Sequence, residues 1–262
     1  MAKNVTKYKL EEFDGLRRAG RLAAETLDYI TPFVKPGVST GALDDLLEAF
    51  MRQHGGVPAT IGYHGYEKAS CISPNHVVCH GIPSPTKILQ DGDIINIDIT
   101  VIIDGWYGDT SRMYYVGKPS IKARRLVETT YATMMAGIEQ CLPGKTTGDI
   151  GHAMQTLAAE YNYSTVLDFC GHGIGRVFHG APNILNYGTP GTGVKLEPGM
   201  VFTVEPMVNV GTYQTLTLSD GWTTITKDRS LSAQFEHMLG ITETGYEIFT
   251  LSPKGWTYPP YR

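Results

Sequence analysis

The stretch that decides the fold of this chain is IDITVIIDGWYGDTSRMYYVG, residues 97–117. Most of its residues are β-branched or aromatic, which favours strands, and Asp104-Gly105 in the middle is typical of a two-residue type I′ hairpin turn. Such a turn would place Asp98 and Asp109 on one face of the hairpin as diagonal neighbours, roughly 7–8 Å apart at the backbone. Two carboxylates in a buried sheet repel each other unless positive charge lies between them.

The composition of the 262 residues is that of an ordinary globular protein, with 42% hydrophobic and 18% charged residues. The net charge of −4 gives no basic surface for nucleic acid or an anionic membrane. No apolar run reaches membrane-spanning length, and the first residues lack the apolar core of a signal peptide. The four cysteines show no C-x-x-C spacing, which favours a reducing compartment. We therefore expect a cytoplasmic protein without a nucleic-acid or membrane partner.

Hydrophobic periodicity predicts two pairs of helices, each pair followed by strands. The expected helices are 16–33, 40–50, 120–140 and 147–161, and the expected strands are 70–74, 77–82, a hairpin at 94–116, 165–170, 201–210, 222–227, 233–241 and 246–251. The segment PGVSTGALDDLLEAF from Pro36 resembles PGKTTGDIGHAMQTL from Pro143. This phrase is also a good helix-stop, helix-start signal, but the flanking elements match as well. The pattern predicts one domain, 1–262, with related halves at about 10–117 and 118–252.

A set of acids and one histidine lies in apolar strand contexts, whereas serine-hydrolase and helical zinc motifs are absent from the sequence. The set is Asp98, Asp109, His172, Glu205 and Glu236. Four buried carboxylates in one cavity would repel one another or take up protons. Two divalent cations would balance the four charges, and this donor set suits Mn²⁺ or Fe²⁺ and also accepts Co²⁺ or Zn²⁺. Such a pair of ions is suited to metal-assisted hydrolysis.

Six motifs extend this reading to a known family. VVCHGIP, INIDIT, GWYGDTSRMY, GHGIGRVFH, FTVEPM and SAQFEHM resemble those of the type I methionine aminopeptidases in their short bacterial form, which are M24-type metallopeptidases. The likeness covers residues 8–252. It implies an α+β pita-bread fold, in which two pseudo-symmetric α/β halves with antiparallel sheets enclose a central dimetal site. It also implies a metalloaminopeptidase that removes the N-terminal methionine, before a small second residue, from nascent proteins and peptides by a metal-bridged hydroxide.

The resemblance assigns roles to individual residues. It implies that all five residues of the set bind the metals, with Asp109 and Glu236 bridging. His80 and His179 match the two histidines that face the substrate, and together with Glu205 they are the expected catalytic residues. The implied methionine pocket consists of Tyr63, Tyr66, Cys71, Phe178 and Trp222. A monovalent-cation site is implied at the backbone of Asn75, Val77 and Ser232, and Thr60 stands where some relatives carry a pocket cysteine.

Two other functions stay open at this point. An X-Pro-specific aminopeptidase or prolidase would share the metal ligands, but such enzymes usually carry an additional N-terminal domain, for which the residues before Asp98 leave no space. A non-catalytic pita-bread binding protein would have lost metal ligands, and all five are present. The short interval between His179 and Glu205 also leaves no room for the insertion of type II enzymes. We expect a monomer that meets the N-termini of nascent polypeptides at the ribosome.

Overall fold

The computed structural model describes residues 5–261, in which the main helices occur in two pairs. The helices are α1 (Phe13–Ile30), α2 (Thr40–Gln53), α3 (Ile121–Ile138) and α4 (Thr147–Glu160). Side chains fix where they begin: Ser39 Oγ accepts a hydrogen bond from the Ala42 amide, and Ser120 Oγ accepts one from the Ala123 amide. All four helices lie where hydrophobic periodicity predicts them. Within the described residues, no helix is both long and apolar enough to cross a bilayer.

Fifteen short strands form one large sheet and two small ones in the described part of the chain. The strands are β1 (Val57–Pro58), β2 (Cys71–Pro74), β3 (Val77–Cys79), β4 (Ile94–Ile103), β5 (Trp106–Tyr115), β6 (Ser164–Thr165), β7 (Cys170–Gly173), β8 (Gly180–Leu185), β9 (Val201–Val204), β10 (Met207–Asn209), β11 (Thr215–Thr217), β12 (Thr224–Thr226), β13 (Ser232–Gln234), β14 (Glu236–Ile241) and β15 (Tyr246–Ile248). The large sheet has the order β1-β4-β5-β14-β9-β7-β8, with β15 on β14 and β2 on β4. Every pairing is antiparallel, as expected.

The β4–β5 hairpin has the predicted turn and register. Asp104 and Gly105 both have positive φ angles, 51° and 75°, which is the backbone conformation of a type I′ turn. Thr100 lies opposite Asp109, and Asp98 lies opposite Ser111. Side chains alternate between the two faces of a strand, so Asp98 and Asp109 share one face. The prediction for the segment that decides the fold is confirmed.

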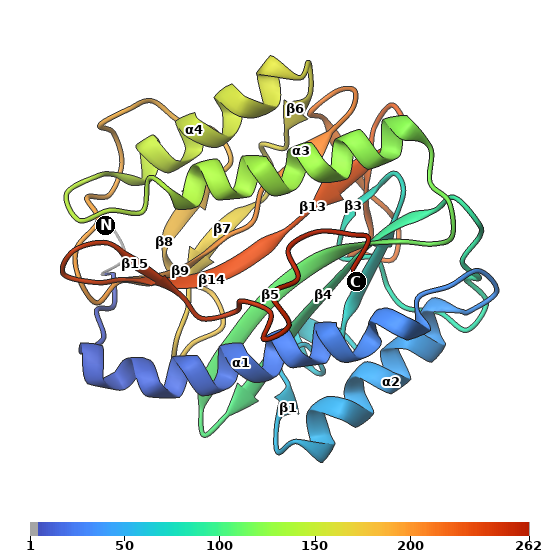
Figure 1. Cartoon of the computed structure of the whole chain (residues 1–262), viewed down its shortest axis with the longest axis horizontal. Coiled ribbons are helices and arrows are strands. Elements are labelled where there is room, and N and C mark those ends of the chain that lie inside the picture. The colour runs from blue at the N-terminus through green and yellow to red at the C-terminus, as the bar shows by residue number, and fades with distance from the viewer. Residues whose placement is uncertain (1–4, 262) are drawn as a thin grey trace.

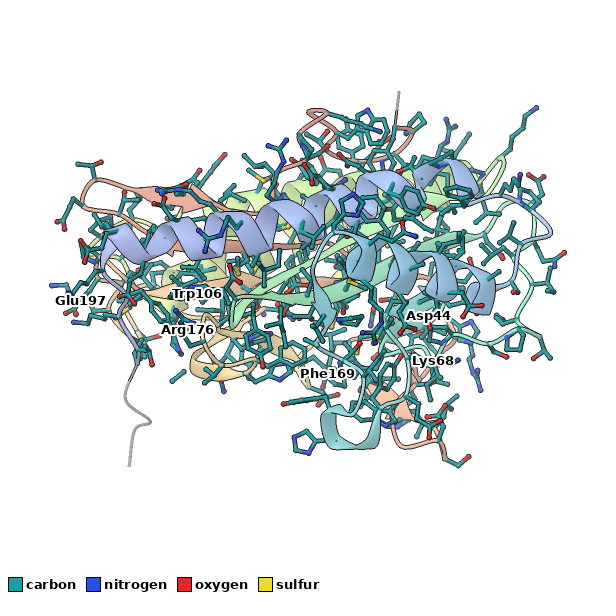
Figure 2. The ribbon with its side chains drawn as sticks, turned by 90° about the horizontal axis from the view of Figure 1, so that it is seen from below. Asp44, Lys68, Trp106, Phe169, Arg176 and Glu197 are labelled. Carbon is teal, nitrogen blue, oxygen red and sulfur yellow. The ribbon has the colours of Figure 1, made fainter. Side chains whose placement is uncertain are left out.

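The helices cover one face of the large sheet and leave the other face for a cavity. One buried core joins α1 and α2 to β2, β4 and β5, and another joins α3 and α4 to β9, β13 and β14. Figure 1 shows the α1–α2 pair and the α3–α4 pair over different parts of the sheet, with the C-terminal segment between α1 and α3. Figure 2, seen from below, shows α1 on one side of the sheet and Phe169 on the opposite side. Phe169 lines a hollow on that opposite face.

Three strand predictions need correction, and one strand was missed. The expected strand 233–241 is divided at Phe235, because β13 belongs to a small sheet and β14 to the large one. The expected strand 165–170 is a two-residue strand, β6, followed by a turn before β7 begins at Cys170. The expected strand 201–210 is interrupted at Glu205-Pro206, because β9 belongs to the large sheet and β10 to a small one. The sequence also gave no indication of β8, which contains Pro182. Proline lacks an N–H donor and is tolerated in β8 because this strand is at the edge of the sheet.

Candidate active site

The five residues of the predicted metal set converge on one cavity of about 350 Å³. They come from five different strands or strand ends: Asp98 from β4, Asp109 from β5, His172 from β7, Glu205 from the end of β9 and Glu236 from β14. Ligand atoms of Asp109, His172 and Glu236 lie within 4.8 Å of one another. Asp98 lines the same cavity, and Glu205 Oε1 lies 3.5 Å from His172 Nε2. The large sheet therefore brings together residues that are up to 138 positions apart. The hairpin spacing alone predicts this proximity only for Asp98 and Asp109.

No positive side chain balances these acids. Within residues 5–261, no Lys or Arg lies at ion-pairing distance from Asp98, Asp109, Glu205 or Glu236. Burial raises the pKa of Asp98 to about 7. Burial, and then repulsion by neighbouring carboxylates, raises the pKa values of the other three well above the ordinary range. A cluster of this kind is stable as carboxylates only when cations occupy the space between them.

The histidine of the cluster leaves one ring nitrogen available as a metal ligand. His172 Nδ1 lies 3.2 Å from the Gly173 carbonyl oxygen, and a carbonyl can only accept, so Nδ1 carries the proton. Nε2 then presents its lone pair, and it lies 3.5 Å from Asp109 Oδ2. Burial, together with the nearby His179, lowers the pKa of His172 to about 3, so the ring is neutral at pH 7. A neutral imidazole held by a hydrogen bond on its other nitrogen is the usual form of a histidine that binds metal.

Neighbouring side chains hold two of the carboxylates in place. Thr100 Oγ1 donates to Asp109 Oδ1 at 2.7 Å, and Thr203 Oγ1 donates to Glu205 Oε1 at 2.8 Å. Gln234 Nε2 donates to the other oxygen of Glu205 at 3.3 Å. The sequence interpretation missed these three residues. Gln234 precedes Glu236 by two positions, and the two-residue period of a strand could have placed both on the cavity face.

The two predicted substrate-facing histidines lie in the wall of the same cavity. The His179 ring lies 4.2 Å from the His172 ring between centroids, and its Nδ1 lies 2.6 Å from the Tyr63 hydroxyl. Loss of hydration, and then the neighbouring histidines His80 and His64, lower the pKa of His179 to about 4. Burial lowers the pKa of His80, whose φ angle of 57° is rare for a residue with a side chain. Both rings are therefore neutral at pH 7.

Aromatic residues line the part of the cavity predicted to hold methionine. The five residues of that pocket, Tyr63, Tyr66, Cys71, Phe178 and Trp222, are all in the cavity wall, as is Thr60. Tyr66 meets Trp222 edge to face at 5.0 Å between centroids, and Tyr63 lies 4.8 Å from Phe178. The Thr60 hydroxyl donates to the Lys68 carbonyl at 2.7 Å, so it is engaged with the loop and not with the cavity centre. Further lining residues that the sequence interpretation missed are Cys79, Phe169, Cys170, Asn183 and Met207.

The residues of the predicted monovalent-cation site come from the turn between β2 and β3 (Asn75), from β3 (Val77) and from β13 (Ser232). The Ser232 amide donates to the Asn75 carbonyl at 2.8 Å. Val77 is the first residue of β3, close to Asn75 in the chain, and pairs with Ile225. The Ser232 hydroxyl oxygen is buried and has no hydrogen-bond partner.

Comparison with known proteins now identifies the family. The model of metallopeptidase family M24 matches residues 14–243. The methionine aminopeptidase of Rickettsia prowazekii is 60% identical over 252 residues, which cover 96% of this chain and 97% of the relative. The chain belongs to the methionine aminopeptidases of family M24. A crystal structure of methionine aminopeptidase from R. prowazekii superposes with a TM-score of 0.93 and 57% identity, covering 95% of this chain and all of that one. The pita-bread fold expected from the sequence is thereby confirmed.

Members of the family with proline specificity are more distant. The Xaa-Pro dipeptidase of Bacillus anthracis is 25% identical with a TM-score of 0.74, and the match covers 94% of this chain but only 62% of the dipeptidase. The closer agreement with methionine aminopeptidases, in identity and in length, favours a methionine aminopeptidase over an X-Pro-specific enzyme.

Proposed function

We propose that this protein hydrolyses the peptide bond after an N-terminal methionine, in nascent proteins and peptides whose second residue is small. One observation carries this proposal. A carboxylate cluster without a cationic partner and an aromatic pocket with a buried cysteine line the same cavity. Aromatic rings and a soft sulfur group suit a thioether side chain. The cluster beside them is suited to a free amine and a scissile carbonyl. The first residue of a polypeptide would therefore fill the pocket and present its bond to the cluster.

The donor set fits two divalent metal ions. Four carboxylates match the charge of two such ions, and His172 supplies one neutral nitrogen. Oxygen-rich ligation with a single imidazole suits Mn²⁺, Fe²⁺, Co²⁺ or Zn²⁺. In this proposal the residues that would hold the ions are Asp98, Asp109, His172, Glu205 and Glu236, and the resemblance gives Asp109 and Glu236 the role of shared ligands. When bound, the two ions supply Lewis acidity that polarises the scissile carbonyl and acidifies a water molecule.

The protein's own residues supply proton transfer and positioning. Glu205, held at both carboxylate oxygens by Thr203 and Gln234, accepts the proton of the attacking water and passes it to the leaving amine. His179 donates from Nε2 to the substrate peptide unit as negative charge develops there. Its Nδ1 lies 2.6 Å from the Tyr63 hydroxyl, whose pKa is raised by burial. In this proposal the hydroxyl donates to Nδ1, so that the ring proton is on Nε2. His80 faces the substrate from the same cavity, beside Trp222 and Phe169.

The remaining expectations also form part of the proposal. The partnerless Ser232 hydroxyl, next to the Asn75 carbonyl, supports a monovalent-cation site with Asn75, Val77 and Ser232. A single catalytic domain over 1–262, with duplicated halves at about 10–117 and 118–252, stays a prediction. A monomeric state, a cytoplasmic location and an encounter with nascent chains at the ribosome also stay predictions.

One assay tests the proposed function against both alternatives. Metal-stripped protein is reconstituted with Mn²⁺ and incubated with Met-Ala-Ser, Leu-Ala-Ser and Met-Pro-Ser, and the products are identified by mass. We expect free methionine from Met-Ala-Ser and little release of leucine. Preferential cleavage of Met-Pro-Ser would indicate an X-Pro enzyme. Metal binding without cleavage of any peptide would indicate a binding protein.

A further inference from the structure

The active-site cavity continues across the edge of the large sheet. β8 is the last strand of that sheet, and its partner in the described residues is β7. His172 pairs with Asn183 and Cys170 pairs with Leu185, so the two pairs are two residues apart along the strands. Residues two apart on a strand, and residues directly opposite across a ladder, project from the same face. Because His172 faces the cavity, Cys170, Asn183 and Leu185 lie on the cavity side of the sheet as well.

A second hollow, of about 510 Å³, lies between the β8 edge of the sheet and α4, and it shares Asn183 with the first. Its walls include Asn183, Leu185 and Tyr187 from β8 and the turn after it, Gln155 from α4, and Thr189 and Thr192. Asn183 is exposed and lines both hollows. Asn183 and Leu185 project from the same face of β8, and Tyr187 lies in the bend after the strand. These three residues form a floor between the active-site cavity and Gln155. We name this floor and its walls the β8 groove.

The position of the methionine pocket fixes which part of a substrate meets the groove. Tyr66, Cys71 and Trp222 occupy the side of the cavity formed by β2 and the loops around it. The wall formed by β7 and β8 contains Cys170, Gly180 and Asn183, which the methionine side chain and the metal cluster leave free. A polypeptide with its first residue in the methionine pocket can therefore leave across β7 and β8. In extended form each further residue advances about 3.3 Å.

We propose that the β8 groove binds the main chain of the substrate from about the second to the fourth residue after the scissile bond. This inference rests on the proposed function. All residues that line the second hollow are uncharged, and Asn183, Gln155 and the two threonines offer both donors and acceptors. Such groups suit peptide amides of any sequence, whereas a charged wall would select among side chains. The groove is therefore a subsite for polypeptide substrates that adds affinity without restricting their sequence.

The test introduces a charge into the groove far from the metal cluster. Gln155 is an exposed residue of α4, so Gln155→Lys should fold normally, and Gln53→Lys on the exposed end of α2 is a matched control. The probes are Met-Ala-Ser-Asp-Gly, Met-Ala-Ser-Lys-Gly and the dipeptide Met-Ala, assayed with Mn²⁺-loaded protein. In the native protein the two pentapeptides should have KM values within twofold of each other, and both values should be lower than that of Met-Ala.

In Gln155→Lys the ratio of the two pentapeptide KM values should shift about three- to tenfold in favour of the aspartate peptide, because one exposed ion pair forms and one repulsion appears. The KM of Met-Ala should stay within twofold, and Gln53→Lys should leave all three values unchanged. An unchanged pentapeptide ratio in Gln155→Lys, or an equal shift in Gln53→Lys, would overturn the groove while leaving the proposed function intact. No release of methionine from any probe would overturn the proposed function and the groove together.

Discussion

The two faces of strand β5 carry two different kinds of buried charge. On the helix side, Arg112 pairs with Asp28 of α1, and the side chains are only 3% and 4% exposed. Ser252 in the C-terminal segment donates to both oxygens of Asp28, so this cluster is complete within the protein. On the cavity side, Asp109 faces further carboxylates and no cationic side chain. The first cluster joins the C-terminal segment and α1 to the sheet, and the second needs ions from outside.

This difference distinguishes a structural site from a functional one more clearly than burial does. Both clusters are buried and both depend on residues distant in the sequence. A buried ion pair is stable when each charge has a partner, and an unpartnered buried carboxylate raises its pKa or recruits a cation. The cavity cluster is the one in which charges remain unbalanced, and it is the one beside the substrate pocket.

The largest effect is expected for Asp109→Asn. We expect methionine release to fall to background, because both proposed metal ions lose a shared anionic ligand. The metal-free variant should be at least as stable as the metal-free native protein, since one repulsive charge has gone. Peptide cleavage and urea unfolding in chelator measure these two effects. Near-normal turnover with two metal ions bound would show that Asp109 is not a metal ligand.

On the opposite face, Arg112→Met should lower the free energy of unfolding by about 3–5 kcal/mol, because it leaves Asp28 buried without its cation. The double variant Asp28→Asn/Arg112→Met is the control, and it should recover most of the loss. Urea unfolding followed by circular dichroism gives these values. A loss below about 1 kcal/mol for Arg112→Met would mean that this pair resembles an exposed salt bridge.

The stability of metal-free protein should fall as the pH rises. The folded pKa of Asp98 is about 7, above its ordinary value of 3.8, so the folded state binds more protons than the unfolded state between these values. By proton linkage, the free energy of unfolding therefore decreases from about pH 4 to about pH 7. Urea unfolding in chelator across this range measures the slope. A flat or rising profile in the native protein would contradict the prediction, and a fall that persists unchanged in Asp98→Asn would show that Asp98 is not its cause.

His179→Ala should lower kcat by about 10²–10³, roughly 2.7–4 kcal/mol, while KM and the number of bound metal ions stay nearly unchanged. The reason is that a hydrogen-bond donor to developing negative charge stabilises the transition state more than bound substrate. Glu205→Gln is the contrasting variant, in which metal occupancy and kcat should fall together. Fewer bound metal ions in His179→Ala would show that His179 is a metal ligand and belongs to the unbalanced cluster.

The smallest effect is expected for Tyr63→Phe. This change keeps the aromatic ring in the methionine pocket but removes the hydroxyl 2.6 Å from His179 Nδ1. We expect kcat to fall about tenfold, in line with the loss of one hydrogen bond of about 1.4 kcal/mol, while KM stays within twofold. Nitrogen NMR of His179 should show a mixed tautomer in place of the Nε2–H form. A rise in KM with unchanged kcat would show that Tyr63 lines the pocket and does not act through His179.

The sequence predicted those features that depend on neighbouring residues. The Asp104-Gly105 turn and the alternation around it gave the hairpin, its register and the shared face of Asp98 and Asp109. β8 was missed because Pro182 is unfavourable in a strand unless that strand is at an edge, and edge position is a property of the whole sheet. The bonds from Thr203 and Gln234 to Glu205, and the pairing of Cys170 with Leu185, also depend on contacts that local patterns do not contain.

The comparison of the two faces is tested most directly by calorimetric titration of metal-stripped protein with Mn²⁺ at pH 7.5. The account predicts two ions bound per native chain, and two ions bound in the helix-face variant Asp28→Asn/Arg112→Met. It predicts that Asp109→Asn loses high-affinity binding of at least one ion. Two ions bound with undiminished affinity in Asp109→Asn, or no ion bound by a native protein that still releases methionine, would contradict it.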